Sequence, residues 1–309
     1  MIRPKALITA AGKGTRHYPA TNAVQKEMFP LVDRDGISKP TLQLIVEEVL
    51  AAGIEEIAVI VQPGEEEQFR RHFTPLEENE RSAFRDKPWA LQQSAKLAQI
   101  GASLTFLYQT EQKGFGHAVY CGREWAGNAP ILLLLGDHVY LSRTDRSCVH
   151  QVLQVFGRTG KSVFGLQRTP AEEIHLFGVA AGNPCGEGLY ELHAILEKPS
   201  VEDARRQLRV ETLPSDHFLT IFGIYVLTPT IFAILDEHIR TDRRERGEIQ
   251  LTSALAELIA REGALGYEVQ GERLDMGTPL GWLQTQIALA AAGVYAQPLK
   301  HYLRSRFLL

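Results

Sequence analysis

The sequence KALITAAGKGTR at residues 5–16 determines which class of fold the chain can adopt. Its first part, 5–11, is a short continuous apolar run that ends at glycine, which is typical of a strand buried on both faces. The loop that follows carries two glycines together with Lys13 and Arg16. Ligands of α/β sheets bind where parallel strands end, and glycine lets backbone N–H groups approach a phosphate closely. These residues therefore predict an α/β sheet with an anion site at its carboxyl edge.

The residues after this loop continue the same pattern. Apolar side chains recur with a period of 3.6 residues in 40–52, which predicts an amphipathic helix that stops at Gly53, and 54–61 returns to strand. This β-loop-α-β order opens a mostly parallel sheet, for which we expect six or seven strands. Further strands are predicted at 104–108, 131–135, 162–166 and 219–227, and a hairpin at 178–188.

Composition limits the partners and the compartment. A chain of 309 residues with 44% hydrophobic content can bury a large core, and a formal net charge of −4 provides no overall positive field for nucleic acid. The apolar run near the start of the chain is too short for a signal peptide, and no run approaches the ~18 apolar residues of a membrane span. We expect a soluble, cytoplasmic protein with no nucleic-acid or membrane partner.

The cysteines fit no structural framework. Cys121, Cys148 and Cys185 are odd in number and far apart in sequence, unlike a disulfide set or a CxxC metal site. We expect each to be a small buried residue.

Two familiar phosphate-binding patterns fail at the first loop. The dinucleotide fingerprint needs a third glycine where His17 stands, and the P-loop needs Ser or Thr where Gly14 follows Lys13. On its own, the loop is also compatible with a simple tight turn.

The longer string AAGKGTRHYPATNAVQKEMFPLVD, residues 10–33, resembles the signature of the sugar nucleotidyltransferases, most closely the bacterial UTP–glucose-1-phosphate uridylyltransferases. The family pattern A-G-x-G-T-R, followed by L-P-A-T-K-x-x-P-K-E-M-L-P, is in register with 18–21 and 26–30. The resemblance implies a Rossmann-like, glycosyltransferase-A-like fold, with a mixed, mostly parallel sheet flanked by helices. It also implies an enzyme that joins glucose 1-phosphate and UTP, giving UDP-glucose and pyrophosphate.

The same resemblance implies which residues bind the nucleotide. Arg16 and Lys26 would act as catalytic cations on the triphosphate, since cations and glycine amides make charge-assisted bonds to phosphate. Gln109 precedes the run KGFGHAV at 113–119, which is similar to a second family element. For His117 we expect a local bond in the first turn of a helix. The implied nucleotide-binding residues are Ala11, Gly12, Gly14, Glu27, Gln109 and Gly114.

Two aspartates are implied as Mg²⁺ ligands. Asp137 follows the apolar strand 131–135. By residue type alone it is also compatible with a helix cap, and it matches the family's L-x-D element. Asp275 lies in LDMGT, 274–278, which is similar to an element of the thymidylyltransferase relatives. Mg²⁺ favours one or two carboxylates together with phosphate oxygens. Attack on the α-phosphate would then be in line, assisted by Mg²⁺, with no general base.

The sugar side rests on shorter strings. Glu197-Lys198-Pro199 and Phe177-Gly178-Val179 resemble the family's sugar-phosphate grip. The resemblance implies that Glu197 accepts from sugar hydroxyls, that Lys198 is a catalytic cation on the sugar phosphate, and that Gly178 admits the hexose. GEIQLT at 247–252 is similar to a further element, although an acidic helix start is a sufficient structural role for it.

Departures from the family pattern keep alternatives open. Asn22 stands where a lysine is usual and Gln25 where a proline is usual, which favours a non-catalytic, sugar-nucleotide-binding regulator as one alternative. Gly136 and 274–278 favour a thymidylyltransferase that uses dTTP. A nicotinamide dehydrogenase is disfavoured because the third fingerprint glycine is absent. The segment 34–38 looks inserted.

The chain divides into a catalytic domain and a C-terminal segment. We assign 1–278 to the nucleotidyltransferase domain and 279–309 to a helical segment with a strong helix at 279–292. That segment either forms a homo-oligomer contact or packs on its own core. The charged stretch 65–87 is expected to be solvated helix and loop at one edge, with no function of its own.

Overall fold

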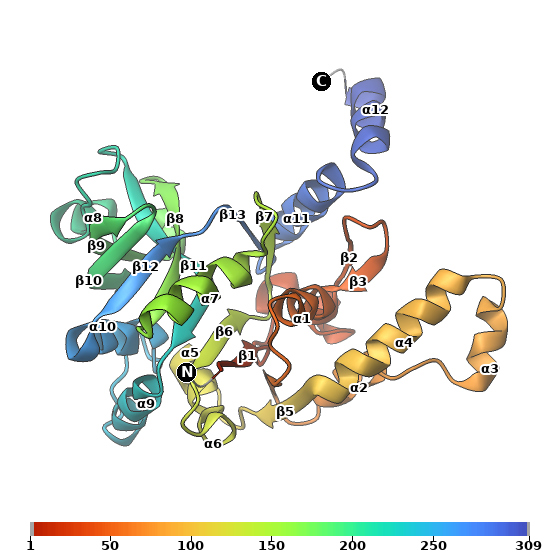
Figure 1. The fold of residues 1–309 in the computed structure, drawn as a ribbon, viewed down its shortest axis with the longest axis horizontal. Coiled ribbons are helices and arrows are strands. Elements are labelled where there is room, and N and C mark those ends of the chain that lie inside the picture. The colour runs from red at the N-terminus through yellow and green to blue at the C-terminus, as the bar shows by residue number, and fades with distance from the viewer. Residues whose placement is uncertain (1–2, 308–309) are drawn as a thin grey trace.

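Strand β1 (Lys5–Thr9) lies between two parallel neighbours, and the rest of the sheet is built outward from it. It pairs in parallel with β4 (Ile57–Val61) on one side and with β6 (Ile131–Leu135) on the other. The structure, a computed structural model, describes residues 3–307. Figure 1 shows the sheet flanked by helices, with α12 on an arm that leads away from it and α2 to α4 in a second projection.

The main sheet is mixed and has nine strands, so the expectation of six or seven was too low. One half is parallel: β5, β4, β1 and β6. Beyond β6 the pairings are mostly antiparallel, because β11 runs opposite to both β6 and β8, and β10 opposite to both β12 and β9. The expected mixed α/β sheet is confirmed. Strand β5 (Leu104–Tyr108) forms one edge of the sheet, next to β4. On the other side of β6 the order is β11 (His217–Leu227), β8 (Val163–Pro170), β12 (Ala264–Glu268), β10 (Leu189–Glu197) and β9 (Gly178–Gly186).

Helices cover both faces of the sheet, which explains why the strands are continuous apolar runs. In β1, Leu7 packs into one hydrophobic layer while Ala6 and Ile8 pack into the other. The first layer includes α5, α6, α8, α9 and α10; the second includes α1, α2, α4 and α7. The helices are α1 (Thr41–Ala51), α2 (Glu66–His72), α3 (Glu78–Arg81), α4 (Pro88–Ser103), α5 (Phe115–Tyr120), α6 (Arg123–Ala126), α7 (Cys148–Thr159), α8 (Val201–Gln207), α9 (Thr230–Arg240), α10 (Leu251–Glu262), α11 (Pro279–Ala291) and α12 (Ala296–Phe307).

The segment 34–38, which looked inserted, forms the turn of a small hairpin between β2 (Pro30–Val32) and β3 (Ser38–Pro40). The hairpin holds the C-terminal segment: Val294 N donates to Arg34 O at 2.9 Å, and Gln286 Nε2 donates to Pro30 O at 2.9 Å. The base of the hairpin is closed by buried Lys39, which pairs with three carboxylates, those of Asp33, Asp35 and Glu47.

A second small ladder positions residues for the site. Strand β7 (His138–Ser142), directly after Asp137, pairs antiparallel with β13 (Gly271–Asp275). The predicted helix at 279–292 is confirmed as α11, whose N-terminus is capped by Thr278 Oγ1 accepting from Gly281 N at 3.1 Å. The domain boundary at 278 and the oligomer contact stay predictions.

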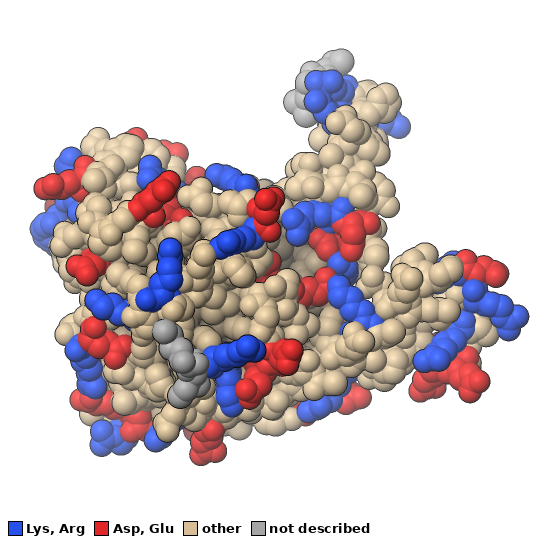
Figure 2. Space-filling view, viewed as in Figure 1, with Lys and Arg blue, Asp and Glu red and all other residues tan. Residues whose placement is uncertain are grey.

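The three cysteines differ in burial, and charges of both signs are mixed on the surface. Cys148 is buried and Cys121 half-buried, but Cys185 is exposed, so its predicted burial was wrong. Cys185 lies where edge strand β9 extends past the core. On the face in Figure 2, Lys and Arg are interspersed with Asp and Glu, without a large area of one sign. Between residues 3 and 307, none of the helices is both long and apolar enough to cross a bilayer.

The central position of β1 makes its core side chains important for stability. We expect Leu7→Ala to lower the free energy of unfolding by about 3 kcal/mol, because Leu7 is fully buried and its removal leaves a cavity. Leu91→Ala on α4 is the matched control, since Leu91 is 38% exposed, and it should change the value by less than about 0.5 kcal/mol. Urea denaturation measures both, and equal effects would contradict the central role of β1.

Candidate active site

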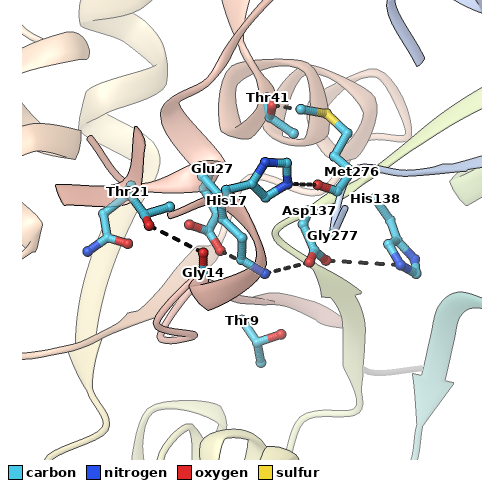
Figure 3. A network of polar contacts seen from close by, with 12 residues as sticks. Thr9, Gly14, His17, Thr21, Glu27, Thr41, Asp137, His138, Met276 and Gly277 are labelled. Carbon is cyan, nitrogen blue, oxygen red and sulfur yellow. Dashed lines mark hydrogen bonds and ion pairs between the residues drawn. The ribbon is translucent and has the colours of Figure 1, made fainter. Parts of the chain in front are cut away.

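The register of β1 and β6 brings two predicted loops together. Thr9 lies opposite Leu135, so both strands end at the same level, and Gly136 N donates to Thr9 O at 2.9 Å. The loop that starts at Ala10 and the carboxylate of Asp137 are therefore adjacent. Figure 3 shows Asp137 among side chains that come from the first 30 residues and from the region around Met276.

An ion pair between Lys26 and Asp137 holds the centre of the site. Lys26 Nζ lies 2.5 Å from Asp137 Oδ2, and both side chains are about five-sixths buried. Burial alone would raise the pKa of Asp137, but the Lys26 ammonium, together with His138 and a backbone hydrogen bond, outweighs burial and lowers that pKa to about 2. Burial likewise opposes the charge of Lys26, and Asp137 raises the pKa of Lys26 in spite of it. Both groups are thus charged at neutral pH.

Glu27 lies beneath this pair. Its side chain is 1% exposed, its Oε1 is 3.6 Å from Lys26 Nζ, and its Oε2 has no hydrogen-bond partner among the described residues. Burial raises the pKa of Glu27 to about 8, so the carboxyl is protonated at neutral pH. A protonated carboxyl offers both a donor and an acceptor. The nucleotide-binding role of Glu27 stays a prediction.

Asp275 reaches the site from the opposite strand. In the β7–β13 ladder Asp275 pairs with His138, whose Nε2 lies 3.6 Å from Asp275 Oδ1 and 4.0 Å from Asp137 Oδ1. Burial lowers the pKa of His138, although the two carboxylates oppose this shift. No role was predicted for His138; its place directly after Asp137 was the available signal.

Three groups converge on the space in front of Gly277. A Cβ built on Gly277 would lie 3.0 Å from Asp275 Oδ1 and 3.4 Å from both Asp137 Oδ2 and Arg16 Nη1. Two hard carboxylate oxygens beside a small open space suit a divalent cation that takes its other ligands from phosphate. Within residues 3–307, no group of three or more His, Cys, Asp or Glu side chains is arranged to hold a metal alone.

The loop after β1, residues 10–17, is called the nucleotide loop after its predicted role. Its last residue, His17, joins it to the segment after Asp275. Its Nε2 is 2.7 Å from Met276 O, and because a carbonyl only accepts, this nitrogen carries the proton. The ring also meets Phe29 edge to face, with 5.0 Å between centroids. His17 is therefore an anchor for the neighbouring Arg16. The sequence pattern marks His17 only as the residue that breaks a dinucleotide fingerprint.

The sugar-side residues meet at the ends of β9 and β10. Gly178 begins β9, Glu197 ends β10, and a Cβ on Gly178 would lie 3.4 Å from Glu197 Oε2. Thr252 Oγ1 donates to the same oxygen at 2.6 Å. Lys198 has a positive φ of 46°, a conformation that costs free energy for a non-glycine residue and that concentrates at functional sites.

One cavity of about 370 Å³ is lined both by Asp137 with Asp275 and by Glu197 with Lys198. The remaining predicted residues lie on the nucleotide loop, next to Lys26 or after β5, and Lys26 reaches the cavity wall through Asp137. Predicted residues that line the cavity are Arg16, Asp137, Gly178, Glu197, Lys198 and Asp275. Residues without a predicted role also line it, among them Phe177, His138, Arg273, Glu248, Gln250 and Thr252.

The predicted base-binding loop is buttressed from behind. Gln109, 3% exposed, donates from Nε2 to Gly114 O at 3.1 Å. Gly114 has a φ of 114°, and a Cβ there would lie 2.7 Å from Glu248 Cβ. His117 makes the expected local contact, with Nδ1 3.3 Å from Gln109 Nε2. The segment 247–252 thus does more than start a helix, because it also packs against this loop and lines the cavity.

The structure accounts for one of the two departures from the family pattern, Gln25, but not for the other, Asn22. Gln25 Nε2 donates to Glu65 Oε1, and Gln25 N donates to Gln68 Oε1 at 3.4 Å. The edge segment that begins at Glu65 therefore braces the residue next to Lys26, which was not expected. Asn22 is exposed in the short helix at 20–22, and nothing in the structure explains its substitution for lysine.

Glu27 should make stability fall as pH rises. Its pKa is about 8 in the folded protein and 4.5 in the unfolded chain, so between these values only the folded state keeps the proton. The free energy of unfolding should therefore decrease from about pH 5 to about pH 8. Glu27→Gln, which has no proton to lose, should show a smaller decrease in urea denaturation across this range. Parallel curves for the two proteins would contradict the burial of a protonated carboxyl.

Comparison with known proteins identifies the family of the chain. A family model described as Nucleotidyl transferase matches residues 5–291. UTP–glucose-1-phosphate uridylyltransferase 1 of Staphylococcus saprophyticus is 37% identical over 291 residues, covering 94% of each chain. The UTP–glucose-1-phosphate uridylyltransferase of Bacillus subtilis is 36% identical over 286 residues, covering 93% of this chain and 90% of the relative.

A solved structure is similar over the same extent. The crystal structure of a UDP-glucose pyrophosphorylase complexed with UDP-glucose has a TM-score of 0.76 and 31% identity, and covers 93% of this chain and 98% of that one. The family model and the relatives each span most of the sequence. This chain therefore belongs to the nucleotidyl transferase family.

Proposed function

We propose that this protein is a UTP–glucose-1-phosphate uridylyltransferase, which joins glucose 1-phosphate and UTP to form UDP-glucose and pyrophosphate. The observation that carries the proposal is the single cavity in which cations and carboxylates from both halves of the chain meet. Arg16, Asp137 and Asp275 form one end of its lining, and Glu197 with Lys198 the other. The relatives described above carry this activity in their names, which supports the same substrates here.

The reaction needs positioning and charge stabilisation more than acid–base chemistry. An oxygen of the sugar phosphate bonds to the α-phosphorus of UTP while the bond from that phosphorus to the leaving pyrophosphate oxygen breaks. The attacking oxygen is already anionic, so no general base is needed. Arg16 and Lys26 hold the triphosphate, and Lys198 holds the sugar phosphate, which lowers the barrier by fixing both reactants in line.

Mg²⁺ fits the acidic end of the cavity. Asp137 and Asp275 would hold it, because the low pKa of Asp137, about 2, keeps that carboxylate ionised and because both offer hard oxygens. When bound, Mg²⁺ supplies positive charge that offsets the charge of the phosphates. The Gly277 backbone leaves room between the two carboxylates.

The nucleotide half supports a pyrimidine base. Ala11, Gly12 and Gly14 belong to the loop that receives base, ribose and phosphate, and Gly12 faces Lys26, since a Cβ there would lie 3.6 Å from Nζ. Gln109 and Gly114 supply amide and backbone groups for a base edge, with Glu27 behind the loop. The sugar hydroxyls are taken by Glu197 beside Gly178.

Turnover tests the proposal directly. Purified protein with Mg²⁺, glucose 1-phosphate and UTP should release pyrophosphate, and dTTP should be used less efficiently. Asp137→Asn should reduce kcat/KM by at least ~100-fold, because it removes the partner of Lys26 and a metal ligand. Asp86→Asn, an exposed position far along the α3–α4 loop, serves as control and should behave as wild type. Preference for dTTP would indicate a thymidylyltransferase, and no turnover would indicate a binding protein.

Gly277 should be needed for the metal and not for the fold. Gly277→Ala places a methyl group between Asp275, Asp137 and Arg16, so we expect the Mg²⁺ concentration for half-maximal turnover to rise by roughly tenfold or more. The control is Gly157→Ala in α7, where a Cβ meets nothing within 4 Å. It should leave turnover unchanged and raise stability slightly. An unchanged Mg²⁺ dependence of Gly277→Ala would contradict the assigned metal position.

A further inference from the structure

Arg273 is a cation of the cavity wall to which no role has been given. It lies in β13 two residues before Asp275, and residues two apart on a strand point to the same face. Both line the cavity, together with Phe177 and Lys198. The side chain therefore stands between the acidic end of the cavity and the sugar end.

The guanidinium is held in place by two contacts. Nη1 donates to Ile221 O on β11, and the central carbon lies 3.7 Å from the centroid of the Phe177 ring. Stacking on an aromatic face leaves the in-plane N–H groups of arginine free to bond elsewhere. Phe177 precedes Gly178, so the contact also fixes the backbone at the start of the sugar-binding strand.

The charge of Arg273 is poorly compensated. No carboxylate lies within ion-pair distance of it in the part of the chain that the structure describes, and its Nε is buried without a partner. Nη2 donates to no residue between 3 and 307. A half-buried cation with unused donors is expected to have an anionic partner, since its desolvation is otherwise uncompensated.

We propose that Arg273, which lines the cavity, binds the phosphate that originates from the sugar phosphate through its unused Nη2 group. This assignment rests on the proposed uridylyl transfer and adds a phosphate-binding residue to it. Lys198 approaches the same phosphate from the end of β10 and Arg273 from β13, so the phosphate is held from two strands. A planar guanidinium fixes the orientation of a phosphate more closely than an ammonium does.

A purely structural role is the competing explanation. Arg273 connects β13, β11 and Phe177, and a residue with only that role would affect every ligand through the shape of the cavity. Three ligands separate the two explanations. UMP lacks the sugar-derived phosphate, UDP carries a phosphate at that position, and UDP-glucose carries both the phosphate and the hexose.

Calorimetric titration of Arg273→Met with these three ligands is the test. We expect affinity for UDP and UDP-glucose to fall by roughly 10- to 100-fold, the value of charge-assisted hydrogen bonds, while UMP binds as to wild type. KM for glucose 1-phosphate should rise, and KM for UTP should not. Arg168→Met, an exposed arginine paired with Glu268, is the matched control and should match wild type for all three ligands.

The other outcomes overturn the assignment. Equal loss for all three ligands indicates a structural role, loss for UDP-glucose alone indicates a hexose contact, and no loss excludes binding. If Arg273→Met does not fold, Arg273→Lys gives the same comparison, with a selective loss for UDP and UDP-glucose expected and an unselective or absent loss contradicting it. Failure of the wild type to bind UDP-glucose or to release pyrophosphate would instead reject the proposed function itself.

Discussion

The parallel pairing of β1 with β6 is the constraint on which the site depends. Parallel strands end on the same side of a sheet, and the register that sets Thr9 opposite Leu135 makes these two end at the same level. The nucleotide loop and Asp137 consequently abut, and Lys26 can reach Asp137 across 111 residues of sequence. That ion pair fixes the position of Lys26, and with it the positions of the neighbouring Glu27 carboxyl and of the loop that carries Arg16.

The change of strand direction beyond β6 explains how a second substrate finds a place. The parallel half of the sheet carries the nucleotide loop, whereas the antiparallel half carries Gly178 and Glu197 at the ends of a hairpin. β11 borders both halves because it pairs with β6 on one side and with β8 on the other. The cavity lies across this boundary, so in the proposed reaction each reactant is held by a different half of the sheet and the reacting phosphates meet between them.

Local patterns predicted much of this arrangement, and contacts between distant residues account for what was missed. The strands at 104–108 and 131–135 were predicted with the observed bounds, because apolar runs between turn residues are a local signal. β12 begins directly after Gly263, the residue that ends α10, and was missed because its run of five residues, ALGYE, is short and only partly apolar. His17 and Arg273 escaped notice because their partners, Met276 and Phe177, lie far away in sequence. For Arg273 a signal existed, since it stands two residues before Asp275 in a strand.

The segment 247–252 has a wider consequence. Ile249 N donates to Lys113 O at 2.7 Å, Ile249 O accepts from Gly116 N at 2.8 Å, and three residues further on Thr252 supports Glu197. One short piece of chain thus braces both the loop proposed for the base and the carboxylate proposed for the sugar. A substitution that remodels one of these supports must therefore remain compatible with the other, which couples the two ends of the cavity through six residues of chain.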